Sequence, residues 1–237
     1  MVGYTLVNFI IFRAVCCFIS SHFLTGVQHH TRQGALAQYA KATVSIGVAK
    51  RPLNITPVEA AGVTLVALTS YQALFKIAKL EAGQTVFING GSSALGIYAI
   101  QMAKAKGIKV VTTASSKKEQ FVRSLGADEV GFIAPSFHGY YHTIVFMQFI
   151  DYTKMPLHEY LTQNPPTTKY HAIYDAVGLI DPSLFTYSEK YLAPDGVFIT
   201  SGPMPKSISA SEMWNLAKTL TAMFWPSWLG GTNRKYV

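Results

Sequence analysis

Short apolar segments alternate with longer amphipathic ones along most of the chain. The short segments are rich in β-branched residues and bounded by turns, which predicts buried strands. They cover residues 85–88, 108–113, 172–178 and 196–202. The longer segments predict helices at residues 94–106, 117–125 and 183–193. Strands that alternate with helices predict an α/β fold, in which a doubly wound parallel sheet is covered by helices on both faces.

A further helix is predicted before the first of these strands. Thr56 and Glu59 form a capping-box sequence with Pro57 at the first helical position. The helical pattern then continues toward Leu80, with a break expected near residues 69–70. This helix leads directly into the alternating part of the chain.

Two segments do not follow the alternation. Residues 2–27 are apolar with Arg13 as their single formal charge, and residues 131–149 are aromatic and almost uncharged. The first segment is long enough to cross a bilayer, but a central arginine costs about 2.5–3.5 kcal/mol on insertion scales. No positive charge precedes it as in a signal peptide. We interpret residues 1–30 as an apolar leader, with membrane attachment as the weaker alternative.

Charge and cysteine content exclude several kinds of site. The net charge is +8, but no run of five basic residues occurs, so the sequence does not support nucleic-acid binding. Cys16 and Cys17 are adjacent and the only cysteines, which disfavours a structural disulfide and rules out a four-thiolate zinc site. This predicts a reducing, cytoplasmic location. The pairs His138/His142 and His29/His30 lack the partners of a metal motif, and no metal site is predicted.

A glycine-rich turn follows the first predicted strand and opens the next helix. In this context a tight turn can present backbone N–H groups and a helix N-terminus to a pyrophosphate. Gly90, Gly91 and Gly96 meet that demand, whereas Ser93 occupies the place of the usual middle glycine. The serine hydroxyls of Ser92 and Ser93 add donors. A turn that serves packing alone is the alternative interpretation.

The end of the second predicted strand bears on the choice of nucleotide. A fold that prefers NAD places an acidic residue there to bind the ribose 2′-hydroxyl. Here no acid occurs before Glu119, and two hydroxyls and two ammonium groups follow the strand instead, on Ser115, Ser116, Lys117 and Lys118. These groups suit a 2′-phosphate and favour NADPH. An ordinary solvated helix start is the alternative.

Several motifs together resemble a known family. They are GALAQYAKA, AAGVTLVALTSYQAL, INGGSSALGIYAIQMAKA, IDYTK, YDAVG and YLAPDGVFITSGP, in this order from about residue 34 to the C-terminus. The chain resembles zinc-independent medium-chain dehydrogenases/reductases of the quinone-oxidoreductase and enoyl-reductase type. The resemblance implies NADPH, a Rossmann domain with a GroES-like barrel, and hydride transfer to a quinone or an activated C=C bond. It also implies a small-molecule substrate and pairing of two chains through the edge of the Rossmann sheet.

The resemblance assigns cofactor-binding roles residue by residue. Residues 90–96 match the pyrophosphate turn, and Thr69 matches a position that faces the nicotinamide. Other positions match the 2′-phosphate pocket or the loops beside the nicotinamide ring. The cofactor-binding residues are thus Thr69, Gly90, Gly91, Ser92, Ser93, Ala94, Leu95, Gly96, Ser115, Ser116, Lys118, Tyr152, Gly178, Ser201 and Gly202. No catalytic residue is assigned.

The departures from the family pattern set the expected domain organisation. We expect the leader at residues 1–30, a partial GroES-like barrel at 31–65, and the NADP-binding Rossmann domain at 66–237 with an insert at 131–149. The leader and the insert also have the character of translated non-coding sequence. The last Rossmann strand is expected beyond Val237. Because most of the barrel is missing, a cofactor-binding remnant without turnover is the alternative to an active reductase.

Overall fold

The structure is a computed structural model that describes residues 4–8, 39–43, 52–133, 156–202, 210–225 and 231–237. The chain divides into two compact units, Met1–Ser70 and Tyr71–Val237. Most of the predicted insert, the predicted site residue Tyr152 and the histidine and cysteine pairs lie outside the described residues. Among the described residues, no helix is long and apolar enough to span a membrane.

The first unit contains a pair of short strands and a helix. Strands β1 (Tyr4–Asn8) and β2 (Tyr39–Thr43) pair antiparallel. Helix α3 (Pro57–Tyr71) begins as the capping box predicts, because the Thr56 backbone N–H donates to Glu59 Oε2 at 2.7 Å and the Glu59 N–H donates to Thr56 Oγ1 at 3.3 Å. The Thr56 backbone N–H and the Thr56 hydroxyl, which donates to Glu59 Oε2 at 2.8 Å, lower the pKa of the Glu59 carboxyl.

The helical stretch changes its winding instead of breaking. Immediately after α3, the π-helix η1 (Gln72–Ile77) begins, so the change falls just after the break predicted at residues 69–70. The π-helix belongs to the second unit, where the buried Ala73 and Leu74 join its core.

The second unit is built on a six-stranded sheet. Its order is β5-β4-β3-β6-β7-β8, and every adjacent pair is parallel. The strands are β3 (Thr85–Asn89), β4 (Lys109–Ser115), β5 (Glu129–Ile133), β6 (Tyr170–Asp175), β7 (Leu192–Thr200) and β8 (Lys235–Tyr236). Along the chain, β4 and β5 follow on one side of β3, and β6, β7 and β8 then follow on its other side. This is the strand order of the Rossmann fold, with its switch point between β3 and β6.

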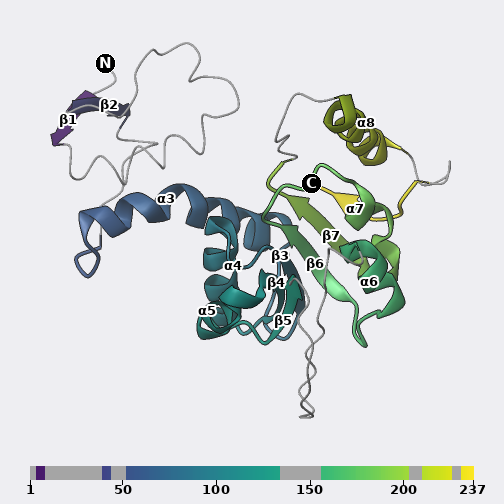
Figure 1. Cartoon of the computed structure of the whole chain (residues 1–237). Helices are drawn as coiled ribbons and strands as arrows, with labels where there is room; N and C mark the ends of the chain where they lie inside the picture. The colour runs from purple at the N-terminus through teal and green to yellow at the C-terminus, as the bar shows by residue number, and fades with distance from the viewer. Residues whose placement is uncertain (1–3, 9–38, 44–51, 134–155, 203–209, 226–230) are drawn as a thin grey trace. The chain divides into compact units, whose positions relative to one another are not determined.

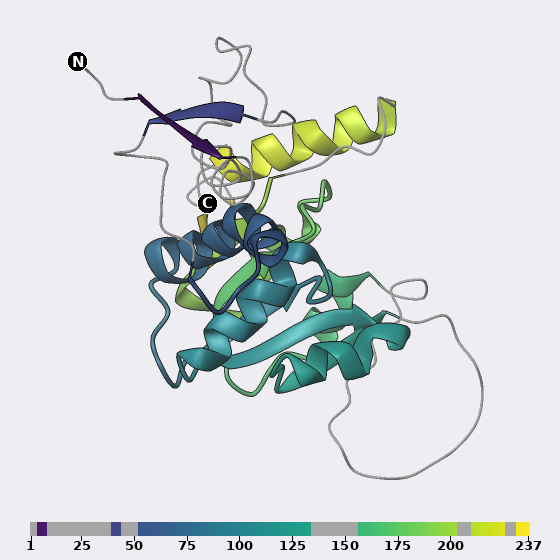
Figure 2. The same cartoon turned by 90° about the vertical axis from the view of Figure 1, so that its left-hand side faces the viewer.

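Helices cover both faces of this sheet (Figures 1 and 2). The helices are α4 (Ala94–Ala105), η2 (Ser116–Lys118), α5 (Glu119–Ser124), α6 (Leu157–Gln163), α7 (Ser183–Thr186), η3 (Ser188–Lys190) and α8 (Ala210–Phe224). Helices α4 and α5 lie on one side and α6 and α7 on the other. The doubly wound α/β arrangement predicted from the sequence is confirmed.

Alternation along the strands creates two separate cores. Val86 and Ile88 of β3 pack with α4, whereas Phe87 between them packs on the opposite face. On that second face, Tyr191 is fully buried and its hydroxyl donates to the Leu184 carbonyl oxygen at 2.6 Å. Burial raises the pKa of the Tyr191 hydroxyl, which therefore stays protonated and keeps this hydrogen bond.

Several elements differ from the sequence prediction. Strand β5 includes Gly131–Ile133, the first residues of the predicted insert, and pairs along its length with β4. The strand expected beyond Val237 already begins within the chain, because β8 pairs with β7 through Lys235 and Tyr236. Helices α6 and α8 were not predicted. The helix expected at residues 183–193 is divided into α7 and η3 and ends at Lys190, before β7 starts at Leu192.

Candidate functional site: the crevice at the carboxyl ends of the strands

The glycine turn joins β3 to α4 at the switch point of the sheet. Gly90 has a φ of +83°, a conformation that glycine adopts without strain. A Cβ atom on Gly96 would lie 2.3 Å from the Gly90 carbonyl oxygen, and one on Gly91 would lie 2.2 Å from Thr112 Oγ1. All three glycines are therefore required by the close approach of helix, turn and strand.

The turn is tied to the end of β4. The Gly90 N–H donates to Thr113 Oγ1 and the Gly91 N–H donates to the Thr113 carbonyl oxygen, both at 2.8 Å. The Ser93 N–H donates back to the Gly90 carbonyl oxygen at 2.9 Å. Both amides are therefore used inside the chain, so Gly90 and Gly91 would meet a ligand through close backbone approach and not through these N–H groups.

Ser93 caps the helix that leaves the turn. Its hydroxyl accepts a hydrogen bond from the Gly96 N–H at 3.0 Å and lies 3.4 Å from the Ala176 carbonyl oxygen. This explains the serine at the middle-glycine position: it satisfies an amide of the first helical turn. Within the described residues, the amides of Ser92 and Ala94 donate no hydrogen bond, so these two remain for a ligand at the positive end of α4.

A buried polar network lies directly below the turn. Asn89 donates from Nδ2 to Asp175 Oδ1 at 2.9 Å and accepts at Oδ1 from Thr113 Oγ1 at 2.8 Å. Asp175 is 1% exposed and also accepts from the backbone N–H groups of Val177 and Leu179, at 3.3 and 2.6 Å. The network links the ends of β3, β4 and β6. It was not predicted, although β3 and β6 each end in a polar residue, Asn89 and Asp175.

The loops after β6 and β7 meet beside the turn. A Cβ atom on Gly178 would lie 2.2 Å from the Gly202 carbonyl oxygen and 3.3 Å from Ser201 Oγ. The Ser201 N–H donates to the Asp175 carbonyl oxygen at 3.1 Å. A Cβ atom on Gly90 would lie 2.3 Å from Val177, whose side chain is half exposed. The structure therefore brings Gly178, Ser201 and Gly202 together with the turn, as the resemblance implied.

Two cations, Lys117 and Lys118, directly follow the end of β4. Ser115, Lys117 and Lys118 are exposed, and η2 begins at Ser116. The nearby Glu119 pairs with Arg123 at 2.9 Å. Among the described residues, Lys117 and Lys118 form no ion pair, and Lys118 Nζ lies 5.7 Å from the centre of the Phe121 ring. Because Thr113 holds the glycine turn, these groups lie beyond the same strand end as the turn.

Some predicted site residues are not brought to this crevice by the described contacts. Thr69 lies in α3 of the other unit, where its hydroxyl donates to the Leu65 carbonyl oxygen at 2.8 Å. Leu95 is partly buried and packs against the core of the second unit. In the part of the chain that is described, no three His, Cys, Asp or Glu side chains are placed to hold a metal ion.

The fold and the glycine turn define a dinucleotide-type Rossmann unit, and comparison with known proteins identifies its family. Residues 94–234, more than half of the chain, match the zinc-binding dehydrogenase family. The chain belongs to this family. The resemblance to medium-chain dehydrogenases/reductases of the quinone- and enoyl-reductase type is thereby confirmed.

Individual relatives agree with this assignment. The chain is 31% identical to the trans-enoyl reductase poxH of Penicillium oxalicum, over 93% of this chain and 56% of that protein. It is also 31% identical to the chloroplast envelope quinone oxidoreductase homolog of Arabidopsis thaliana, over 82% of this chain and 51% of that protein. The chain thus spans about half the length of the curated relatives it matches.

Solved structures share the fold. The mycobacterial protein Rv1454c, whose structure was solved as a complex with NADPH, matches with a TM-score of 0.54 and 23% identity. The match covers 80% of this chain and 60% of that one.

Proposed function

We propose that the second unit binds NADPH in the crevice formed by the glycine turn, the end of β4 and the loops after β6 and β7. This proposal rests on which backbone N–H groups of the turn are already hydrogen-bonded within the chain. The amides of Gly90 and Gly91 donate to Thr113, that of Ser93 donates to Gly90, and that of Gly96 donates to Ser93. Within the described residues, the amides of Ser92 and Ala94 are left without a partner at the N-terminus of α4. Both donors lie at the positive end of α4, where a pyrophosphate would accept from them.

The crevice fits a pyrophosphate in shape and in charge. Glycine at positions 90, 91 and 96 lets the backbone approach closely where side chains would collide. The macrodipole of α4 adds about half a positive charge at its N-terminus, next to the two remaining amides. These residues would bind the diphosphate, and Val177 would offer an apolar surface to the cofactor beside it.

The end of β4 fits the additional phosphate of NADPH. Ser115 offers a hydroxyl, and Lys117 and Lys118 offer two ammonium groups without a carboxylate partner among the described residues. An acidic residue that would bind the 2′-hydroxyl of NADH is missing between Thr113 and Lys118. The same groups therefore attract a 2′-phosphate and give no advantage to NADH. Most of the binding energy would still come from the turn, which both nucleotides use.

We expect the double substitution K117Q/K118Q to separate the two nucleotides. Loss of both cations should weaken NADPH binding roughly tenfold to hundredfold, because each charge-assisted contact is worth about 1.5–3 kcal/mol before solvent screening. NADH affinity should change less than about twofold, because NADH has no 2′-phosphate. Nucleotide fluorescence titration of the full chain measures both affinities.

Lys106→Gln provides the matched control, since Lys106 is an exposed lysine at the other end of α4. It should leave both affinities unchanged. Equal weakening of NADPH and NADH by K117Q/K118Q would contradict the assignment of these lysines to the 2′-phosphate.

We further propose that the chain acts in hydride transfer from NADPH to a quinone or to an activated C=C bond. The family and the enoyl- and quinone-reductase relatives support this reaction. The bound nicotinamide would supply the hydride, while the loops bearing Gly178 and Gly202 would position it and exclude water. Thr69 and Tyr152 remain proposed cofactor contacts. A cytoplasmic location, zinc independence and pairing of two chains also remain proposals.

Turnover is tested separately from binding. Oxidation of NADPH by the full chain in the presence of a small quinone or an enone, followed by absorbance, reports hydride transfer directly. A chain that binds NADPH and does not oxidise it would support a cofactor-binding remnant, whereas a chain that binds neither nucleotide would remove both proposals.

A further inference from the structure

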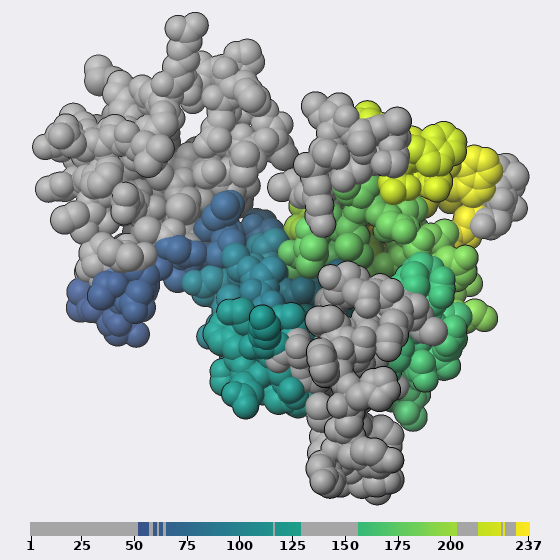
Figure 3. Space-filling view, viewed as in Figure 1, coloured from purple at the N-terminus to yellow at the C-terminus, as the bar shows by residue number. Residues whose placement is uncertain are grey.

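Helix α8 presents an exposed apolar face although it is fixed to the second unit. The Thr219 hydroxyl on its inner face donates to the Ile180 carbonyl oxygen, and Thr219 is 1% exposed. On the outer side, Met213 is 51% exposed, Trp214 65% and Leu220 46%. Figure 3 shows the helix at the surface of this unit. Of these three side chains, Trp214 lines the groove described next, and its burial against an apolar ligand would be favourable.

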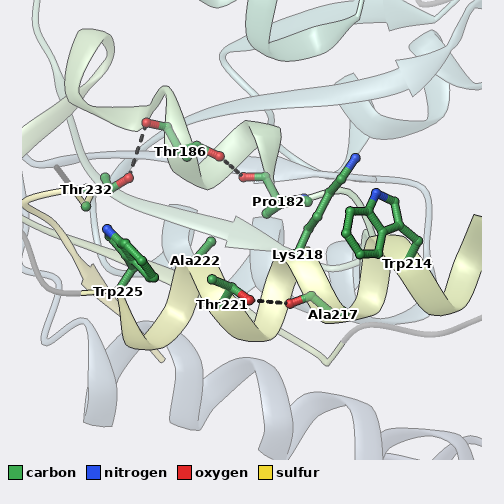
Figure 4. A pocket seen from close by; sticks show the side chains of 10 residues that line it. Pro182, Thr186, Trp214, Ala217, Lys218, Thr221, Ala222, Trp225 and Thr232 are labelled. Atoms are coloured by element: carbon green, nitrogen blue, oxygen red, sulfur yellow. Dashed lines mark hydrogen bonds between the residues drawn. The ribbon is translucent and has the colours of Figure 1, made fainter. Parts of the chain in front are cut away.

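A groove of about 500 Å³ runs along α8 beside α7 (Figure 4). Trp214 and Trp225 lie at its two ends, and Ala217 and Ala222 lie between them. The volume falls within the range of small-molecule pockets. The two indoles and the alanines give the groove an elongated, apolar lining that suits a hydrocarbon chain.

The hydroxyl groups of the groove are already occupied. Thr186 donates to the Pro182 carbonyl oxygen at 2.8 Å, Thr221 to that of Ala217 at 2.8 Å, and Thr232 to that of Thr186 at 3.3 Å. The charged group of the described lining is the Lys218 ammonium, whose Nζ lies 5.8 Å from the centre of the Trp214 ring. The rest of the described lining is mostly apolar, which favours an apolar chain with an anionic end over a sugar.

A second, polar hollow of about 430 Å³ adjoins the groove. The two share Ala222, Trp225 and Thr232. The polar hollow is lined by two cations, Arg234 and Lys235, and by one carboxylate, Asp195. Its side chains therefore carry a net positive charge at neutral pH.

The two cations are available to an anion. The Arg234 guanidinium donates only to backbone carbonyls, from Nε to Leu192 at 3.3 Å and from Nη1 to Asn233 at 2.5 Å. Among the described residues, neither Arg234 nor Lys235 forms an ion pair, and Lys235 is exposed. Asp195 lines the same hollow without pairing with either cation among the described residues, and Glu189 accepts from the Asn233 N–H at 2.8 Å.

We propose that the joined hollows bind a single anionic amphiphile of the fatty-acid class. Its hydrocarbon chain would lie in the groove between Trp214 and Trp225, and its carboxylate would face Arg234 and Lys235. The arrangement supplies both parts of such a ligand: an apolar lining for the chain and a cationic end for the head group. The site is separate from the glycine turn and does not depend on the proposed NADPH binding.

The test uses dodecanoate, below the concentration at which it forms micelles, with the full chain and without nucleotide. Isothermal titration calorimetry should show saturable binding, accompanied by a change in tryptophan fluorescence. Dodecyltrimethylammonium, which has the same chain and a cationic head, should bind at least roughly tenfold more weakly, because a like charge replaces the favourable one. Absence of saturable dodecanoate binding would overturn the proposal.

Two substitutions locate the ligand. Ala217→Trp places an indole in the groove at an exposed position and should weaken binding by roughly tenfold or more. Lys235→Gln should weaken binding by about threefold to tenfold, because one exposed cation is lost. Ala105→Trp and Lys190→Gln are the matched controls, at exposed positions that line neither hollow, and should have no effect.

Two results would contradict this location. Unchanged affinity in both Ala217→Trp and Lys235→Gln would place dodecanoate elsewhere. Binding to anionic phospholipid vesicles, reduced by the same substitutions and without binding of monomeric dodecanoate, would identify α8 as a membrane-binding face instead. Circular dichroism of each variant confirms that it is folded, and NADPH titration of the same samples shows separately whether the crevice functions.

Discussion

Gly96→Ala should weaken NADPH binding by roughly hundredfold or more, equivalent to about 2.8 kcal/mol. The added methyl would lie 2.3 Å from the Gly90 carbonyl oxygen and 2.7 Å from the Gly91 Cα atom, so it meets backbone and not a movable side chain. The turn and the first turn of α4 must then move apart, and the Ser92 and Ala94 amides lose their common direction. Overpacking should also lower the free energy of unfolding by about 1–3 kcal/mol. Nucleotide titration and denaturant unfolding measure the two effects.

Gly62→Ala makes the same chemical change where space is open. No atom lies within 4 Å of a Cβ built on Gly62, which is an exposed residue inside α3. Alanine there should be neutral or stabilise the helix by up to about 1 kcal/mol, without effect on NADPH. A Gly96→Ala chain that binds NADPH as tightly as the unchanged chain would show that the turn does not hold the cofactor.

Asp175→Ala should lower the free energy of unfolding by about 3–5 kcal/mol. The buried carboxylate accepts from Asn89 Nδ2 and from the N–H groups of Val177 and Leu179, and its removal leaves these donors without a partner in the interior. The loss should be visible in urea unfolding. Nucleotide affinity should fall as well, because Asn89 connects Asp175 to Thr113 and thus to the glycine turn.

Asp195→Ala is the matched control on the neighbouring strand. Asp195 is exposed, so its loss should change the free energy of unfolding by less than about 0.5 kcal/mol. If Asp175→Ala were as mild as Asp195→Ala, the network below the turn would contribute little to the site.

The sequence predicted the sheet and the turn because both depend on local patterns. Alternating apolar segments located β3, β4, β6 and β7, and the capping box at Thr56 located the start of α3. Gly96 could be predicted as essential because it opens a helix directly after a strand. Each of these features depends on residues only a few positions apart, so it can be predicted without knowledge of long-range contacts.

The internal use of the turn could not be predicted in the same way. The pairing of Gly90 and Gly91 with Thr113, and of Asn89 with Asp175, joins residues far apart in the sequence. Such contacts depend on which strands become neighbours, and no local pattern specifies them. For the same reason the sequence assigned the Gly90 and Gly91 amides to the ligand, whereas the structure leaves those of Ser92 and Ala94.

The groove along α8 was also missed. Residues 203–237 have no strand–helix alternation, and the exposure of Trp214 and Trp225 follows only from the way Thr219 holds the inner face of the helix. A sequence pattern that mixes apolar and polar positions indicates a helix but not how much of its apolar face is covered.

Residue-resolved NMR of the ¹⁵N-labelled full chain during titration with NADPH shows whether the glycine turn holds the nucleotide. We expect the largest amide shift changes at Ser92 and Ala94, with further changes at Ser115 and Lys118 that NADH does not reproduce. Saturating NADPH without shift changes in the glycine turn, or with changes only at residues distant from the carboxyl ends of β3 and β4, would contradict this expectation.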